Sequence, residues 1–599
     1  MAKVNLKHSG AVIDQQIDRV IDGSVVVENT LSALDENSNK PVSGKGVAEA
    51  INAASNNLKA RGYIYMGVAT PTTTPDVSGG KVFYLAAQAG SYPNFDTTIA
   101  SDMLTSLAWN GERWIAVRIA DLVTPAEVEK AILDNTASEV TADGVTPVSG
   151  KAVYDALAPT SELAEKNKED IGAILSSFGE QDFMYGVEWD TTNPATAMVR
   201  IGNSELHRTL PIHNMMRGCL LDDDGNVLEY LPRKSWVGQT LDGSKGQVMV
   251  EIPEHYRYFE EEGTIRRCKL SLYALPNYHK VPKMYISAYE ATVQRSTTKL
   301  CSVVNTDADY RGGNNNSAWD GTYRTLLGRP ATVISRTNFR NYARKRKSST
   351  TEWNCQDYNA YKAVFWLYYV EYANRNCQLA FNAEKDANGY AQGGLGNGIT
   401  TVSGTAWSEY NGYYPFAPCG HTDELGNGSG EVAYEALKED GSVWATVYAN
   451  RYRGIENPFG HIWKWTDGIN IKISPTEENG GDNTSKVFVA DNPANYNDTG
   501  YDGYAVQGLE ARTEGYVRQL VFGEQGDIMP AVAGGSSTTY WADYHYTNIP
   551  TSEALRGVLF GGNASNGASA GFGFAYSFYA PSAADAPIGS RLCFIPAKE

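Results

Sequence analysis

A seven-residue motif occurs twice in this chain and divides its first 180 residues into modules. Pro-Val-Ser-Gly-Lys-Gly-Val fills positions 41–47, and Pro-Val-Ser-Gly-Lys-Ala-Val fills positions 147–153. Each copy opens a short helical pattern, which is typical of a duplicated connector. One continuous core is therefore excluded for this part of the chain. We predict an N-terminal oligomerisation segment over 1–60, a small β module over 61–122 and a helical connector over 123–180.

The helical pattern after the first copy has apolar residues at spacings of four, three and four, at Val47, Ile51, Ala54 and Leu58. This spacing is that of a short coiled-coil seam. A stripe this brief does not hold chains together alone, and helices docked on a neighbouring domain are an equal alternative. Between the two copies, 81–85 and 114–117 have the composition of strands bounded by turn residues.

The composition of the sequence changes near residue 181, where Trp and Tyr become frequent. We predict a β-rich region over 181–280, with a strand at 247–252 and a turn at 222–226. Apolar positions in 356–381 follow helical spacing and predict a helix with one buried stripe. We predict a shorter helix at 335–347, which is basic. We expect its Arg and Lys side chains to form a solvated face near acidic neighbours rather than an anion-binding site. The predicted fold class is α+β and multidomain.

Charge and hydropathy exclude several classes of partner. The 599 residues include 51 Lys and Arg against 69 Asp and Glu, a net charge of −18. The negative electrostatic field of such a chain repels the phosphate backbone of nucleic acids, so we expect no nucleic acid partner. The longest apolar stretch, 363–370, is far shorter than the ~20 residues that cross a bilayer, so we expect no membrane insertion. The N-terminus has no readable secretory signal, which favours synthesis in the cytoplasm.

Signatures of catalysis and of metal binding are missing from the sequence. Gly150-Lys151 is followed by Ala rather than by the Ser or Thr of a phosphate-binding loop, and neither His-Glu-x-x-His nor Gly-x-Ser-x-Gly occurs. We interpret Asp222–Gly225 as a plain turn rather than part of a calcium loop. The seven cysteines are widely spaced, which favours reduced, buried thiols. His461 and His545 are interpreted as satisfied core or surface histidines. We predict a protein that is not an enzyme and needs no cofactor.

The most informative stretch runs from 557 to 584, where 28 consecutive residues carry no charge. Aromatic residues stand among Gly, Ser, Asn and Ala, the composition of antibody-like binding surfaces, in which rigid rings supply contact area and small polar groups supply hydrogen bonds. We predict that 557–560 are buried and that 563–579 contact a ligand. The aromatic stretch 538–545 is a candidate for the same surface.

Four motifs in order carry a resemblance to a known family. They are Met284-Tyr-Ile-Ser-Ala-Tyr-Glu290, Ser335-Arg-Thr-Asn-Phe339 with the long helix after it, the segment from Arg453 to Trp465, and Gly589-Ser-Arg-Leu-Cys-Phe594. Over about 181–599 the chain resembles the C-type lectin-like fold, in the formylglycine-generating-enzyme-like branch used by target proteins of diversity-generating retroelements in Bacteroides phages and their hosts. The resemblance implies a C-type lectin-like ligand-binding domain over 281–599. The N-terminal part resembles connector modules of phage fibres.

In that family the last part of the lectin-like domain holds a variable binding surface. Carried over by position, the resemblance implies ligand contacts at Tyr540, Trp541, Asn563, Ser565, Asn566, Ser569, Phe572, Phe574, Tyr576, Phe578 and Ser582. Enzymes of the wider fold bind copper through two C-terminal cysteines. Only Cys593 follows Cys419 here, so this resemblance does not extend to that oxidase site.

The resemblance implies a bacteriophage fibre protein of the virion, on head or tail, that binds a host cell-surface glycan or protein. The N-terminal segment would then attach it to other virion proteins, in a homo-oligomer for which we favour a trimer. A purely structural decoration protein that contacts other virion proteins is the alternative, and an oxidase is a third hypothesis.

Overall fold

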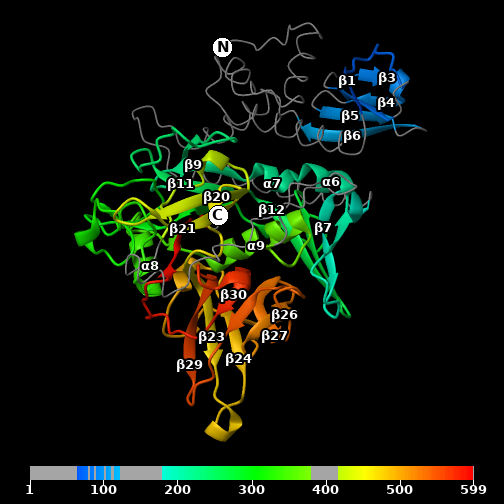
Figure 1. Cartoon of the computed structure of the whole chain (residues 1–599). Helices are drawn as coiled ribbons and strands as arrows, with labels where there is room; N and C mark the ends of the chain where they lie inside the picture. Colours follow the sequence, from blue (N-terminus) through cyan, green and yellow to red (C-terminus); the bar gives the residue numbers. More distant parts are fainter. Residues whose placement is uncertain are drawn as a thin grey trace, which may run out of the picture. The chain divides into compact units, whose positions relative to one another are not determined.

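The computed structural model describes residues 64–121 with short gaps, 179–378 and 416–597. The chain divides into two compact units, residues 1–166 and 167–599, and each is described by itself. Among the described residues the protein is mostly β, with several sheets and few helices, so the predicted α+β class gives too much weight to helices (Figure 1). The segment 1–60, both repeat motifs and almost all of the connector 123–180 lie outside the described residues.

The first unit contains a small four-stranded sheet in the order β1-β2-β5-β6, with β1 and β2 parallel. The predicted strands at 81–85 and 114–117 coincide with β2 and with the first half of β6. Buried aromatic residues, Tyr84, Tyr92 and Phe95, fill its core. A short hairpin of β3 and β4 completes the unit. The strands are β1 (Ile64–Val68), β2 (Val82–Ala86), β3 (Gly90–Tyr92), β4 (Thr97–Ile99), β5 (Met103–Trp109) and β6 (Trp114–Asp121).

In the second unit, two sheets are built largely from residues before 290. A five-stranded sheet has the order β14-β12-β13-β7-β8, and a six-stranded sheet has the order β10-β9-β11-β15-β32-β19. The predicted strand at 247–252 is β11 with those bounds. The strands are β7 (Met184–Asp190), β8 (Val199–Gly202), β9 (Arg217–Leu221), β10 (Val227–Tyr230), β11 (Gln247–Ile252), β12 (His255–Glu262), β13 (Ile265–Ser271), β14 (His279–Val281), β15 (Met284–Glu290), β19 (Trp353–Cys355) and β32 (Arg591–Phe594).

The six-stranded sheet joins the beginning of the second unit to its end. β11 pairs with β15, and β15 pairs with the C-terminal strand β32. One hydrophobic core also extends from Tyr185 to Cys593. The structure therefore shows no separation at residue 280, where the sequence suggested the end of a β-rich region. The reason is physical, because the outer edge of β11 needs a neighbouring strand, which β15 supplies from beyond residue 280.

A mixed sheet in the C-terminal part carries the order β25-β24-β23-β29-β30-β28-β26-β27, and β31 also pairs with β23. Figure 1 shows most of these strands together, coloured yellow to red. The strands are β23 (Trp463–Ile473), β24 (Ser485–Val489), β25 (Ala505–Leu509), β26 (Gly515–Phe522), β27 (Asp527–Ala533), β28 (Tyr544–Tyr546), β29 (Ala554–Gly561), β30 (Gly571–Tyr576) and β31 (Ile588–Gly589).

The described part of the second unit also contains two three-stranded sheets and three short α-helices, together with the long helix considered next. The sheets have the orders β17-β16-β18 and β20-β21-β22. No helix among the described residues is long and apolar enough to cross a bilayer. The elements are β16 (Thr292–Gln294), β17 (Leu300–Cys301), β18 (Tyr310–Arg311), β20 (Gly430–Leu437), β21 (Val443–Tyr452), β22 (Ile455–Glu456), α6 (Ser204–Thr209), α7 (Pro211–Met215) and α8 (Arg336–Arg344).

The predicted long helix is present as α9 (Tyr358–Tyr372). Asp357 caps its start, and the helix ends where Ala373 takes a left-handed conformation with φ of 49°. The prediction of one buried stripe is wrong, because α9 is buried on nearly all sides. It lies between the sheets, against β7, β15 and β23 (Figure 1). A helix enclosed in this way is apolar all round rather than amphipathic.

Candidate functional site

Three neighbouring strands of the C-terminal sheet bring tyrosines side by side. β28 pairs antiparallel with β26, which sets Tyr516 opposite Tyr544. It pairs parallel with β30, which sets Tyr546 opposite Tyr576. Side chains two residues apart in a strand share a face, so Tyr544 and Tyr546 point the same way. The strand register therefore builds a row of rings across three strands.

The rings of this row contact one another in sequence. Centroid distances are 5.0 Å between Tyr516 and Tyr544, 4.9 Å between Tyr544 and Tyr546, and 5.4 Å between Tyr546 and Tyr576. Beyond β30 the row continues at 5.1 Å to Tyr579 and at 5.9 Å to Phe578. All six rings are partly exposed, and Phe578 reaches 37%. We call this set the aromatic ladder: Tyr516, Tyr544, Tyr546, Tyr576, Phe578 and Tyr579.

Two buried rings support the ladder from beneath. Phe574 is fully buried and lies 5.9 Å from Tyr544 and 5.8 Å from Tyr546. Trp463 lies 4.6 Å from Phe574 and 5.2 Å from Tyr576. Aromatic pairs at such distances stabilise each other beyond the area they bury. The ladder is thus fixed before any ligand arrives, which lowers the entropy cost of binding.

Small polar residues border the ladder at one end. The hydroxyls of Ser569 and Tyr516 lie 3.2 Å apart. The loop that carries Ser569 is anchored, because the Gln378 side chain donates to the carbonyl of Gly567 at 2.8 Å. Asn563 holds the same loop by accepting hydrogen bonds from the backbone and hydroxyl of Ser565.

Two of the ladder hydroxyls, those of Tyr546 and Tyr576, are protonated at physiological pH. Burial raises the pKa of Tyr546 and of Tyr576 above the ordinary tyrosine value. The rings therefore offer neutral faces with hydroxyl groups that both donate and accept hydrogen bonds. This surface suits a ligand of hydroxyls, amides and apolar patches.

The structure divides the eleven predicted contact residues into two groups. Four are buried and are removed from the candidate surface: Trp541, Asn563, Phe572 and Phe574. Trp541 packs on Trp189 and Phe365, and Phe572 packs on Tyr361 and Tyr368, in the core around α9. These rings are buried because other elements cover them: α9 contacts Trp541 and Phe572, and Trp463 of β23 contacts Phe574. The others are at least partly exposed: Tyr540, Ser565, Asn566, Ser569, Tyr576, Phe578 and Ser582.

Of the exposed group, Tyr576 and Phe578 belong to the ladder and Ser569 borders it. Tyr540 has a different neighbour, the guanidinium of Arg518, 5.4 Å from its ring. Sequence reasoning missed Tyr516 and Tyr546, while Tyr544 and Tyr579 fall within the predicted stretches 538–545 and 563–579 but were not singled out as contacts. One signal was available, because the Tyr-x-Tyr spacing at 544 and 546 is the period of a strand with one aromatic face.

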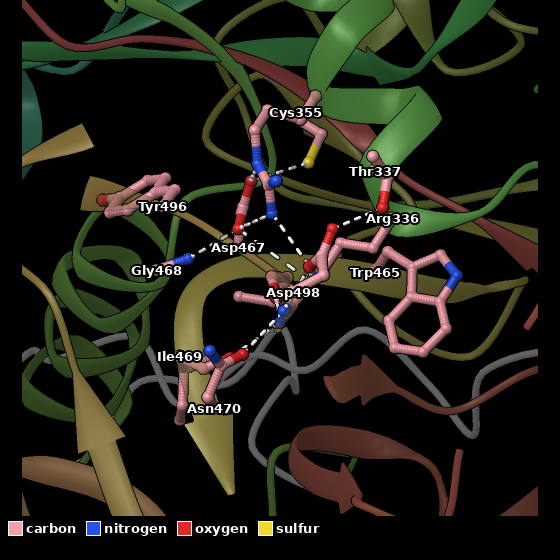
Figure 2. Close-up of polar contacts among 12 residues, drawn as sticks. Arg336, Thr337, Cys355, Trp465, Asp467, Gly468, Ile469, Asn470, Tyr496 and Asp498 are labelled. Carbon is pink, nitrogen blue, oxygen red and sulfur yellow. Dashed lines mark hydrogen bonds and ion pairs between the residues drawn. The ribbon is translucent and has the colours of Figure 1, made fainter. Parts of the chain in front are cut away.

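The basic helix α8 corrects a second expectation. Its arginines do not form a solvated face: Arg336 is 0% and Arg340 6% exposed. Arg340 donates to Asp467 at 2.5 and 2.8 Å and also contacts Asp498. Arg336 contacts the same Asp498 carboxylate (Figure 2). Burial by itself would raise the pKa of Asp498, but the two guanidiniums outweigh it and lower that pKa to about 2. This cluster joins α8 to β23 and is closed to solvent.

Another buried charge lies beneath β28. Glu510 is 3% exposed, and neither of its carboxylate oxygens accepts a hydrogen bond from a described residue. Its nearest cationic candidate is His545, whose Nε2 is 3.7 Å from Oε1. Burial raises the pKa of Glu510 to about 8 and lowers the pKa of His545 to about 4. Both groups are therefore largely neutral near pH 7.

The other predicted core histidine, His461, is fully buried and satisfied. Its Nδ1 lies 2.5 Å from a carboxylate oxygen of Glu290, and its Nε2 accepts from the backbone of Ala417. All seven cysteines are buried and free, and burial raises the pKa of each thiol. Among the described residues, no group of three or more His, Cys, Asp or Glu side chains is placed to hold a metal ion.

Comparisons with known proteins give distant structural similarities. No protein-family profile matches the chain, and no curated protein sequence matches it. The structure of PvdO from Pseudomonas aeruginosa is similar at 12% identity and a TM-score of 0.26, over 60% of this chain and 98% of PvdO. The Major Tropism Determinant U1 variant is similar at 12% identity and a TM-score of 0.18, over 57% of this chain and 72% of that protein.

Proposed function

We propose that this chain is a bacteriophage fibre protein, on head or tail, that binds the host cell surface through the aromatic ladder and catalyses no reaction. The observation that carries the proposal is the ladder itself: six contacting, partly exposed rings, four of them on hydrogen-bonded strands. Isolated exposed rings are common on protein surfaces, but a contiguous aromatic patch marks an interaction site.

The chemistry of the ladder favours a neutral ligand such as a glycan or a protein surface. Tyrosine rings supply large contact areas at a small cost in side-chain entropy, and their hydroxyls adapt to polar groups. The net charge of −18 opposes polyanionic partners. Ser565, Asn566, Ser569 and Ser582 add short polar groups on the same segment of chain.

The phage assignment rests on the N-terminal sequence. The Pro-Val-Ser-Gly-Lys motifs at 41–47 and 147–153 resemble fibre connectors. In this proposal the protein is made in the host cytoplasm and joins the virion, where the N-terminal segment holds a trimer against other virion proteins. Several copies on one particle would convert weak single contacts into strong attachment without any new contact.

The absence of catalysis is argued from the nucleophiles. A thiolate is the reactive form of cysteine, and burial raises the pKa of every cysteine in this chain. His461 is committed to Glu290 and to the backbone. These groups favour a packed core over a reaction centre.

The test is binding of fluorescently labelled full-length protein to intact host cells. We expect saturable binding that Tyr576→Ala weakens by about tenfold or more, as for a central aromatic contact. The matched control is Tyr448→Ala, since Tyr448 is 43% exposed on β21, outside the ladder.

Two outcomes would contradict the proposal. One is equal loss of binding in both variants. The other is no binding at all by a protein that still enters particles, which would favour the alternative of a purely structural decoration protein.

A further inference from the structure

A hollow in the first unit is lined by two tryptophans and two opposite charges. Its volume is about 440 Å³, within the range of ~300–1,000 Å³ typical of small-molecule sites. The lining residues are Trp109 at the end of β5, Trp114 and Ile115 at the start of β6, Arg113 just before β6, and Asp96. All of these lining residues belong to the first unit.

The aromatic wall of the hollow is held in place by the core of the unit. Trp109 and Trp114 are register partners in the β5–β6 hairpin, with centroids 5.5 Å apart. Trp114 packs edge-on against the buried Phe95 at 4.6 Å and lies 6.0 Å from Tyr84. Both tryptophans remain partly exposed. The indole surface is therefore preorganised and open to solvent.

The acidic wall has a constrained backbone. Asp96 follows the 3-10 helix η1 (Pro93–Phe95) and takes a left-handed conformation with φ of 50°. Its backbone N–H donates to the carbonyl of Pro93. Among residues other than glycine, only Asp and Asn adopt this region readily. The side chain is exposed and lines the hollow, as does the exposed Arg113.

We propose that this hollow binds a saccharide unit of a glycan. A sugar ring has an apolar C–H face and a rim of hydroxyls that both donate and accept hydrogen bonds. The indoles match the apolar face, the Asp96 carboxylate accepts from hydroxyls, and the Arg113 guanidinium donates to them. A phosphate group would face the repulsion of Asp96, and a purely apolar ligand would desolvate the Asp96 carboxylate without giving it a hydrogen bond.

The test is saturation-transfer difference NMR of the full-length protein with methyl glycosides of glucose, galactose, mannose, N-acetylglucosamine, rhamnose and fucose. We expect saturable transfer to at least one glycoside, strongest at ring C–H protons. Trp109→Ala and Asp96→Asn should each weaken it by about tenfold or more. Asp96→Asn retains the left-handed backbone, so its effect reports hydrogen bonding rather than folding.

Two control variants make the result specific. Val77→Ala alters a side chain that is 40% exposed in the same unit, and Tyr448→Ala alters one that is 43% exposed in the other unit, outside the ladder. Both should leave glycoside binding unchanged. Absence of transfer to all six glycosides, equal loss of transfer in a control variant, or transfer that survives the hollow variants when each is combined with Tyr576→Ala would overturn the proposal.

Discussion

Tyrosine is concentrated in two places in the second unit, and the two use it differently. On α9, the hydroxyls of Tyr358 and Tyr369 donate to the carboxylates of Asp527 and Asp543, and that of Tyr361 donates to the carbonyl of Phe572. These rings are buried. The ladder rings keep part of their surface in solvent. The comparison shows two uses of tyrosine. A tyrosine belongs to the core when the chain itself bonds its hydroxyl and buries its ring, and it is available for binding when its ring remains exposed to solvent.

The largest expected difference between the two regions is in stability. Tyr361→Ala should lower the free energy of unfolding by about 3–5 kcal/mol, because it opens a cavity beside Phe560 and Phe572. Tyr576→Ala should cost about 1 kcal/mol or less, because its ring is already partly solvated. Urea unfolding of the full chain, followed by near-ultraviolet circular dichroism, measures both. Equal costs would remove the distinction between core and ladder.

Tyr→Phe substitutions, which remove only the hydroxyl group, test the difference between core and ladder more finely. Tyr361→Phe should lower the free energy of unfolding by about 1–3 kcal/mol, because the buried carbonyl of Phe572 loses its partner. Tyr544→Phe should change it by less than about 0.5 kcal/mol, as for a surface substitution. The same unfolding assay applies, and a larger cost for Tyr544→Phe would show that the ladder hydroxyls are structural.

The buried carboxyl beneath β28 predicts a pH dependence. Because the folded pKa of Glu510 is raised to about 8, the folded state holds a proton that the unfolded state releases near pH 4.5. Its contribution to stability is complete below that pH and is lost as pH rises toward 8, by at most about 1.4 kcal/mol per pH unit. His545 opposes this only below about pH 6.5, because its folded pKa is lowered to about 4.

Thermal unfolding between pH 6.5 and 8 isolates Glu510 only as a difference from Glu510→Gln, because the pKa values of Asp423 and Asp543 are also raised to about 7 and those groups titrate in both proteins. Relative to Glu510→Gln, the natural chain should lose stability across this interval. Glu514→Gln is the matched control, since Glu514 is a nearby exposed acid and should leave the slope unchanged. If the unfolding temperatures of the natural chain and of Glu510→Gln change with pH in the same way, Glu510 is ionised in the folded protein.

The smallest expected effect lies at the rim of the ladder. Ser569→Ala removes a hydroxyl 3.2 Å from that of Tyr516 and should weaken cell binding by about two- to tenfold, the worth of one hydrogen bond. Binding of the labelled full chain to intact cells measures this effect. A loss larger than that of Tyr576→Ala would place the centre of the site on the loop rather than on the rings.

Local patterns in the sequence predicted local structure well. The spacing within 356–381 predicted α9, and the apolar run at 247–252 predicted β11, because each depends on neighbours along the chain. The arginines of α8 were misplaced because their partners, Asp467 and Asp498, lie more than a hundred residues away. No local pattern reports such a pairing.

The candidate surface was predicted in part for the same reason. The uncharged composition of 563–579 located the segment, but it did not show which rings face outward. Phe574 and Tyr576 are two residues apart on one strand, yet one is buried and one is partly exposed. Both rings contact Trp463 and Tyr546, so the spacing along the strand does not show which of the two is covered.

The central claim is that the ladder is the surface that meets the host cell. Hydroxyl-radical footprinting of the full-length protein, free and bound to intact host cells, tests it without any substitution. We predict that binding protects Tyr544, Tyr546, Tyr576 and Phe578 from oxidation and leaves the exposed Tyr230 and Tyr448 unchanged. Protection of Tyr230 or Tyr448, with the ladder oxidised as in the free protein, would contradict the claim.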